Sequence, residues 1–122
     1  MKEDVQKELK KIFNGRFSTS ESTRANYARG EDTYDPILSQ AVVFPETNEE
    51  VSKILKLCNE HKVPVVPFGT GTSLEGHVVG NQNGITISLE KMNKVLSVNA
   101  EDFDCRVQAN VTRKQLNEYL RE

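Results

Sequence analysis

Apolar residues recur at helical spacing at the start of the chain. Val5, Leu9 and Ile12 are separated by charged residues, a pattern typical of an amphipathic helix over residues 1–13. The Asn-Gly pair that follows tolerates the left-handed conformation in which helices commonly end. Residues 16–36 are polar and show no period, so we expect an extended arm there.

The next segment alternates between strand and helix patterns. Residues 41–44 are an apolar strand closed by a proline. Thr47 and Glu50 form a capping box, which marks the start of a helix. That helix should end shortly before Pro64, because the residue before a proline avoids helical geometry. Residues 65–66 then predict a second buried strand, and strand, helix and strand at this spacing indicate a βαβ crossover.

Three more strands and a helix are predicted in the last third of the chain. Residues 85–89 alternate between apolar and hydroxyl side chains, which indicates a strand with one buried face. Residues 95–98 and 105–109 predict two further strands. Thr112 and Gln115 form a second capping box, which begins a helix. We therefore predict an α+β fold, in which an N-terminal helix precedes a βαβ unit and further strands.

The chain divides into a helix with an extended arm, residues 1–36, and a folded domain, residues 37–122. The sequence stops at Glu122, inside the last predicted helix. We therefore expect residues 37–122 to be the N-terminal part of a larger domain.

The charge balance argues against a nucleic-acid partner. Sixteen basic and eighteen acidic residues give a net charge of −2, without the basic stripe on which such binding rests. No apolar run is long enough to cross a bilayer, and the first residues lack the apolar core of a signal peptide. A cytoplasmic protein is the expectation.

The two cysteines, Cys58 and Cys105, are expected to be buried free thiols on the apolar faces of their elements. They form no Cys-x-x-Cys pair, and His61 and His77 are the chain's two histidines. A zinc site needs about four ligands at characteristic spacings, so no metal site is predicted.

Candidate chemistry lies in the glycine-rich stretch, residues 67–76, which follows the second predicted strand. It holds three glycines in eight positions, and glycine lets the backbone come close to a ligand. Successive backbone N–H groups can bind phosphate oxygens without a charged side chain, and Thr70, Thr72 and Ser73 add hydroxyl donors. A diphosphate site is one interpretation, and a plain connection between strands is the other.

Two familiar phosphate loops do not fit this stretch. A P-loop ends in Gly-Lys-Ser/Thr, whereas here Gly76 is followed by His77. A Rossmann fingerprint places its third glycine three positions after the second and then opens a helix. Here Gly76 lies five positions after Gly71, and the next predicted element is a strand.

The order of motifs resembles an FAD domain of the vanillyl-alcohol oxidase and p-cresol methylhydroxylase superfamily. The resemblance runs over residues 24–122 and rests on residues 42–51, residues 63–67, the glycine-rich stretch and residues 99–120. Within the superfamily, the glycine-rich stretch is most similar to bacterial glycolate oxidase FAD subunits and FAD-linked D-lactate dehydrogenases.

The resemblance implies that the chain forms the first half of such a domain and that backbone of the glycine-rich stretch wraps the FAD diphosphate. Many relatives attach the flavin through a histidine where this chain has Thr72, so non-covalent FAD is expected. Relatives also read Pro-Gly where this chain has Ala109-Asn110; asparagine tolerates left-handed geometry, so the turn can be kept. The implied cofactor-binding residues are Phe68, Gly69, Thr70, Gly71, Thr72, Ser73, Leu74 and Gly76.

The implied activity is oxidation of a small 2-hydroxy acid, D-lactate or glycolate, by a flavin-dependent enzyme. The hydroxy acid is expected to bind only the full-length enzyme, which could lie at the periphery of the inner membrane. No residue of this chain is predicted to be catalytic, and Glu75, Asp102 and Asp104 are interpreted as surface carboxylates.

Two alternatives stay open. One is a stand-alone module that binds no flavin and forms a homodimer through exposed half-domain surfaces, since an uncovered sheet edge invites self-association. The other is a protein that binds a different nucleotide through the glycine-rich stretch.

Overall fold

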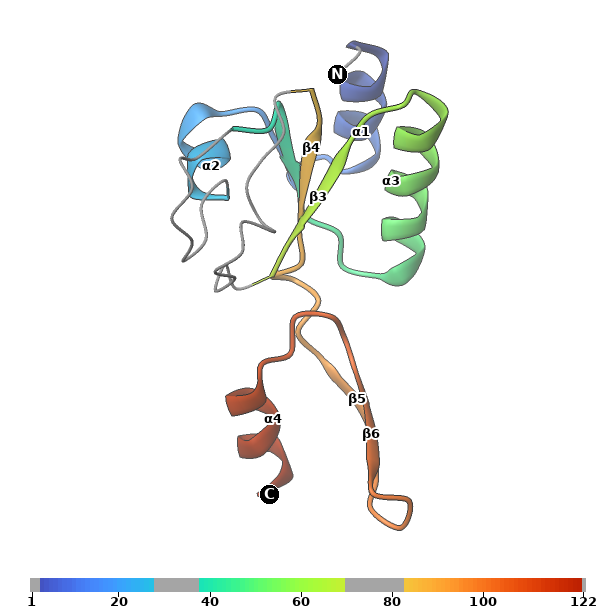
Figure 1. The fold of residues 1–122 in the computed structure, drawn as a ribbon, viewed down its shortest axis with the longest axis vertical. Helices are drawn as coiled ribbons and strands as arrows, with labels where there is room; N and C mark the ends of the chain where they lie inside the picture. The colour runs from blue at the N-terminus through green and yellow to red at the C-terminus, as the bar shows by residue number, and fades with distance from the viewer. Residues whose placement is uncertain (1–2, 28–37, 70–82, 122) are drawn as a thin grey trace.

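The computed structural model describes residues 3–27, 38–69 and 83–121. A four-stranded sheet carries helices on both sides, and a two-stranded hairpin with the last helix extends beyond one end of it (Figure 1). The helices are α1 Glu3–Ile12, α2 Glu21–Asn26, α3 Asn48–Glu60 and α4 Arg113–Leu120. The strands are β1 Phe17–Ser18, β2 Ala41–Val43, β3 Val65–Phe68, β4 Ile85–Ser88, β5 Val95–Asn99 and β6 Asp104–Val107.

The sheet has the strand order β1-β2-β4-β3. β2, β4 and β3 run parallel, and β1 pairs antiparallel with β2 at the edge. The βαβ unit predicted from the sequence is β2-α3-β3, and β4 is inserted between its two strands. The α+β prediction is therefore confirmed, with β4 as the central strand.

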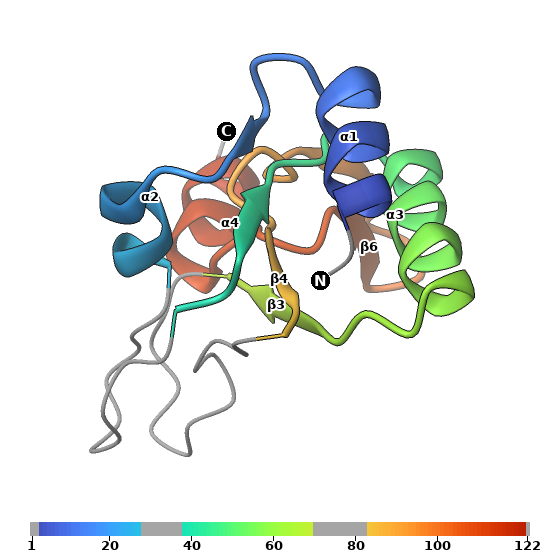
Figure 2. The same cartoon turned by 90° about the horizontal axis from the view of Figure 1, so that it is seen from above.

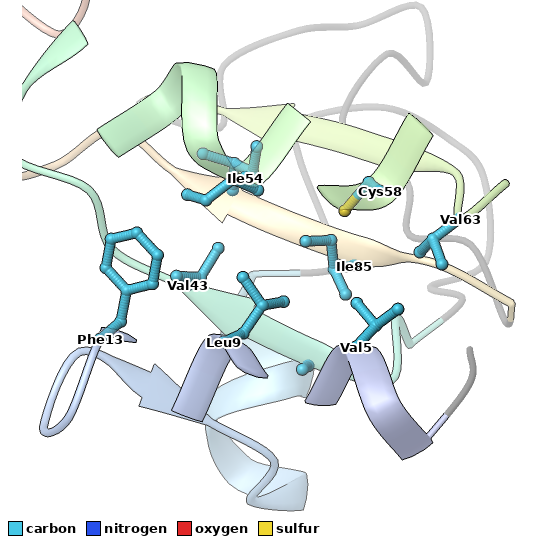
Figure 3. Close-up of a cluster of buried hydrophobic side chains, with 10 residues drawn as sticks. Val5, Leu9, Phe13, Val43, Ile54, Cys58, Val63 and Ile85 are labelled. Atoms are coloured by element: carbon cyan, nitrogen blue, oxygen red, sulfur yellow. The ribbon is translucent and has the colours of Figure 1, made fainter. Parts of the chain in front are cut away.

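The main core lies between the sheet and the helices α1 and α3, which cover one face (Figures 2 and 3). Val5 and Leu9 of α1 are buried as predicted, but Ile12 is 40% exposed and Phe13 is fully buried in its place. Phe13 follows the last residue of the helix, where the chain turns back toward β1, and the turn directs its ring into the core. The guanidinium of Arg16 lies 5.4 Å from the centre of that ring.

The prediction of an irregular arm over residues 16–36 is wrong for its first half. β1 and α2 form there, and residues 28–37 lie outside the described part of the chain. Ser20 caps α2, because its Oγ accepts a hydrogen bond from the Thr23 backbone N–H at 3.2 Å. β1 exists only through pairing with β2, which no local pattern reveals.

The prediction of one buried face for β4 is also wrong, because all four of its residues are buried. Thr86 and Ser88 lie on the face opposite Ile85 and Ile87, and their exposed fractions are 1% and 0%. The Thr86 and Ser39 hydroxyls are 2.7 Å apart and hydrogen-bonded. A buried hydroxyl needs such a bond, so the polar residues of the alternating pattern are compatible with a central strand.

Both predicted helix starts are confirmed. Thr47 Oγ1 accepts from the Glu50 N–H at 3.2 Å, and Thr112 Oγ1 accepts from the Gln115 N–H at 3.1 Å. The side chain of Glu50 accepts from the Glu46 N–H at 2.8 Å, from the backbone N–H of Thr47 and from the Arg16 guanidinium. The Arg16–Glu50 ion pair thereby ties the segment before β1 to the start of α3.

This ion pair predicts a loss of stability in acid. The hydrogen bond from Arg16 is the main reason that the pKa of Glu50 falls from 4.5 to about 2. The folded state therefore gains stability above pH 4.5 and loses it as the pH falls through about 2. We expect Glu50→Gln to destabilise by about 2 kcal/mol at pH 6, since the pair is partly exposed. Urea unfolding at pH 6 and near pH 2 tests this; a deficit as large near pH 2 would contradict it.

The hairpin of β5 and β6 buries little of its surface. Every residue of β6 is exposed, and so is most of β5. Cys105 is therefore exposed, contrary to the predicted burial, because no further element covers this face of the hairpin in the described residues. Cys58 is buried in the core as predicted, and burial raises the pKa of its thiol to about 11.

Candidate cofactor site at the carboxyl edge of the sheet

The three parallel strands end at one edge of the sheet. β2 ends at Val43, β4 at Ser88 and β3 at Phe68. In open α/β sheets, ligands bind outside the carboxyl ends of the strands, because the loops that leave these ends converge there. The glycine-rich stretch begins at this edge, on the side of the hairpin and α4 (Figure 1).

Two of the predicted cofactor-binding residues lie in the described part of the chain. Phe68 is the last residue of β3 and is 7% exposed, and its carbonyl accepts a hydrogen bond from the Leu89 N–H at 2.9 Å. Gly69 follows it directly. Pro67 belongs to β3, an edge strand, where a residue without a backbone N–H is tolerated. Outside the described residues lie Thr70, Gly71, Thr72, Ser73, Leu74 and Gly76.

Gly69 lies against the turn that leads into α4. A Cβ atom at Gly69 would come within 3.3 Å of Asn110 Oδ1, a tight contact that would require the Asn110 side chain to shift by a few tenths of an ångström. Asn110 keeps the turn in place, because its backbone N–H donates to the Met92 carbonyl at 2.8 Å. Asn110 does not use left-handed geometry: among the described non-glycine residues, positive φ occurs only at Lys62 and Phe103.

A hollow of about 350 Å³ opens between Gly69 and the start of α4. The first N–H groups of a helix have no acceptor within the helix and carry a partial positive charge. Arg113, the first residue of α4, adds a cationic side chain to the lining. Close backbone approach at Gly69 together with these donors fits an anionic diphosphate. The lining residues are Gly69, Ala109, Asn110, Val111, Thr112 and Arg113.

A larger hollow of about 650 Å³ lies between α3 and the sheet, but its chemistry does not fit a diphosphate. Its walls include Val51, Leu55 and Met92, and none of its lining residues is Lys or Arg. Nothing there would balance the charge of a phosphate group.

Sequence reasoning missed an aromatic group at the same edge. The Tyr27 ring, directly after α2, lies edge-on to Phe44 and Phe68, with centroid distances of 5.4 Å and 5.3 Å. Its hydroxyl donates to Glu90 Oε1 at 2.8 Å. Burial, with this bond to Glu90, raises the pKa of Tyr27 to about 12, so the hydroxyl remains a donor. The signal in the sequence is an aromatic residue in a polar segment, and Tyr34 of the same segment shares it.

The described residues contain no group of three or more His, Cys, Asp and Glu side chains that could hold a metal ion. Asp102 and Asp104 are exposed beside the tip of the hairpin. In the same part of the chain, no helix is long and apolar enough to cross a membrane.

Residues 39–122 match the model of a protein family described as FAD binding domain. The chain belongs to this family. FAD is accordingly its cofactor. The matched region begins just before β2 and includes the carboxyl edge of the sheet, the glycine-rich stretch and α4.

Enzymes that act on small hydroxy acids are among its relatives. The chain is 44% identical over 105 residues to a probable mitochondrial D-lactate dehydrogenase of Danio rerio, covering 86% of the chain and 21% of that protein. It is 31% identical over 109 residues to a glycolate oxidase subunit of Bacillus subtilis, covering 88% of the chain and 23% of that protein. The chain thus spans about a fifth of the length of these curated relatives.

Solved structures support the same fold. Alkyldihydroxyacetonephosphate synthase superposes with a TM-score of 0.88 at 21% identity, over 99% of this chain and 25% of that one. p-Cresol methylhydroxylase superposes with a TM-score of 0.83 at 24% identity, over 97% of this chain and 24% of that one. The predicted resemblance to the p-cresol methylhydroxylase type of FAD domain is therefore confirmed.

Proposed function

We propose that the chain is the FAD-binding N-terminal part of a flavin-dependent oxidoreductase that oxidises D-lactate or glycolate. The observation that carries the proposal is its 44% identity to a D-lactate dehydrogenase. The hydroxy acid binds only the full-length enzyme, and the FAD domain at 37–122 packs against α1 and β1 from residues 1–36. When bound, FAD accepts the hydride removed from the hydroxy acid.

Within the site, the FAD diphosphate is held by backbone of the glycine-rich stretch. Phe68 and Gly69 supply its start, and the stretch continues through Leu74 and Gly76. The hollow beside Gly69 supports this assignment. It is lined by a residue without a side chain, Gly69, and by the first backbone N–H groups of α4, which can donate to phosphate oxygens. Thr72 has no nucleophilic ring nitrogen with which to attach the flavin, so the cofactor is non-covalent.

A flavin titration tests the proposal. Addition of FAD to the purified chain should shift the flavin absorbance spectrum and saturate at one FAD per chain. ADP should compete, whereas riboflavin, which lacks phosphate, should bind more weakly. Absence of any spectral change would contradict flavin binding by this chain. Displacement of FAD by riboflavin as readily as by ADP would contradict the diphosphate assignment.

A second candidate function is self-association without flavin, because large apolar side chains are exposed on the hairpin and α4. Such a surface favours association of two copies. Sedimentation velocity over a range of concentrations tests it: a flavin-free homodimer supports this candidate, and a monomer at every concentration removes it. The side chains concerned are Leu96, Val98, Phe103, Val107, Tyr119 and Leu120.

A further inference from the structure

Tyr27 contacts the ends of all three parallel strands. Its ring meets Phe44, directly after β2, and Phe68, the last residue of β3. Its hydroxyl donates to Glu90, two residues after β4. One side chain from the N-terminal region thus connects three segments at the edge where the glycine-rich stretch begins.

The short helix α2 depends on contacts with the sheet. That helix has six residues, none of them buried, so it is too short to be stable alone. Arg24 holds it through hydrogen bonds to the Thr19 carbonyl at 3.0 Å and the Ser39 carbonyl at 3.5 Å. Arg24 and Tyr27 therefore dock α2 on the sheet, and Tyr27 makes its contacts at the candidate site.

Phe68 lies at the end of an edge strand. Among the strands that the structure describes, β3 is hydrogen-bonded to β4 alone. At its end, the Phe68 carbonyl accepts from the Leu89 N–H, which restrains the strand on one side. The edge-on contact with Tyr27 restrains the Phe68 ring from another direction. An aromatic pair of this geometry stabilises by about 0.5–1.5 kcal/mol beyond its buried area.

We infer that Tyr27 is a positioning residue for FAD: its ring holds Phe68, and with it the start of the glycine-rich stretch, at the carboxyl edge of the sheet. The inference rests on the proposed function, because it requires that the stretch after Phe68 binds the FAD diphosphate. A site that is held in its binding geometry before the ligand arrives binds more tightly, because less ordering is left for the binding step.

The test compares Tyr27→Ala with Tyr27→Phe by two measurements. Tyr27→Ala removes both ring contacts and should raise the Kd for FAD by about 10- to 100-fold. Hydrogen exchange of the Leu89 amide, which reports the bond to Phe68, should accelerate by about 10-fold. The Ile85 amide, bonded to the Pro64 carbonyl at the other end of the same strand pair, should not change. Tyr27→Phe keeps the ring and should bind FAD within about 3-fold of the natural chain.

Leu57→Ala is the control for a general loss of stability, because Leu57 packs against the core from α3, on the face opposite α2. It should lower stability and leave the Kd for FAD unchanged. An equal rise in Kd for Leu57→Ala, or an unchanged Kd for Tyr27→Ala, would overturn the positioning role while flavin binding stands. Failure of the natural chain to bind FAD would overturn the proposed function and the inference together.

Discussion

We expect Gly71→Val to abolish the retention of FAD. The proposed site binds the diphosphate through backbone N–H groups, which works only where the chain can come close to the phosphate oxygens. Valine adds a branched side chain at the centre of the glycine-rich stretch and is confined to a narrow range of backbone conformations. Both effects remove the close approach, so retention should fall to background.

The measurement is the flavin-to-protein ratio after FAD addition and desalting. If the natural chain releases FAD during desalting, equilibrium titration of the flavin spectrum replaces it. Gly80→Val is the matched control, because Gly80 lies four residues beyond the glycine-rich stretch and outside the predicted cofactor-binding residues. That variant should bind FAD as the natural chain does. Full stoichiometry in Gly71→Val would refute the placement of the diphosphate.

The order of the main elements could be predicted because their signals are local. Thr47 and Thr112 mark the starts of α3 and α4 within one residue, since a cap depends on neighbours three positions away. The end of α3 follows from Pro64 in the same way. An element that depends on a distant partner cannot be predicted from its local sequence. β1 has two residues and forms because β2 lies beside it.

Burial was predicted less well than the elements themselves. The alternation of apolar and hydroxyl residues in β4 correctly indicates a strand. It cannot show that the face with the hydroxyl side chains is buried as well. Thr86 is buried there, and its hydroxyl is hydrogen-bonded to Ser39 from a distant segment. Cys105 shows the opposite error, since its alternating strand is exposed and lies in a hairpin with two strands only.

In the candidate site too, features within one sequence segment could be predicted, whereas contacts between distant segments could not. The family resemblance implies Phe68 and Gly69 as cofactor-binding residues because they belong to one continuous motif, and this assignment stays a prediction. The approach of Gly69 to Asn110 and the contacts of Tyr27 could not be predicted, because they join segments that the sheet brings together. A family resemblance predicts which residues of one continuous motif bind the cofactor. It does not predict how the ends of three strands lie relative to one another, which requires the three-dimensional structure.

Gly84→Ala should cause the largest loss of stability of any substitution proposed for this chain. Gly84 immediately precedes β4, and its carbonyl accepts from the Gln40 N–H at 2.9 Å. A Cβ atom there would lie 2.3 Å from the Pro64 carbonyl oxygen, an approach that real Cβ atoms essentially never show. The obstacle is backbone, so no side-chain rotation relieves it. β3 must move away from β4, and we expect a loss of about 3 kcal/mol or more.

Urea unfolding followed by circular dichroism measures this loss, with Gly15→Ala as the control. Gly15 has a φ of +82° and nothing within 4 Å of its added Cβ, so only backbone strain applies, at about 1 kcal/mol. The contrast separates a steric clash in the sheet from the conformational preference of glycine. Equal losses in the two variants would mean that β3 and β4 can separate at Pro64 without weakening the sheet. Because the same strand pair places Phe68 beside Leu89, such a result would also weaken the case for a rigid start to the glycine-rich stretch.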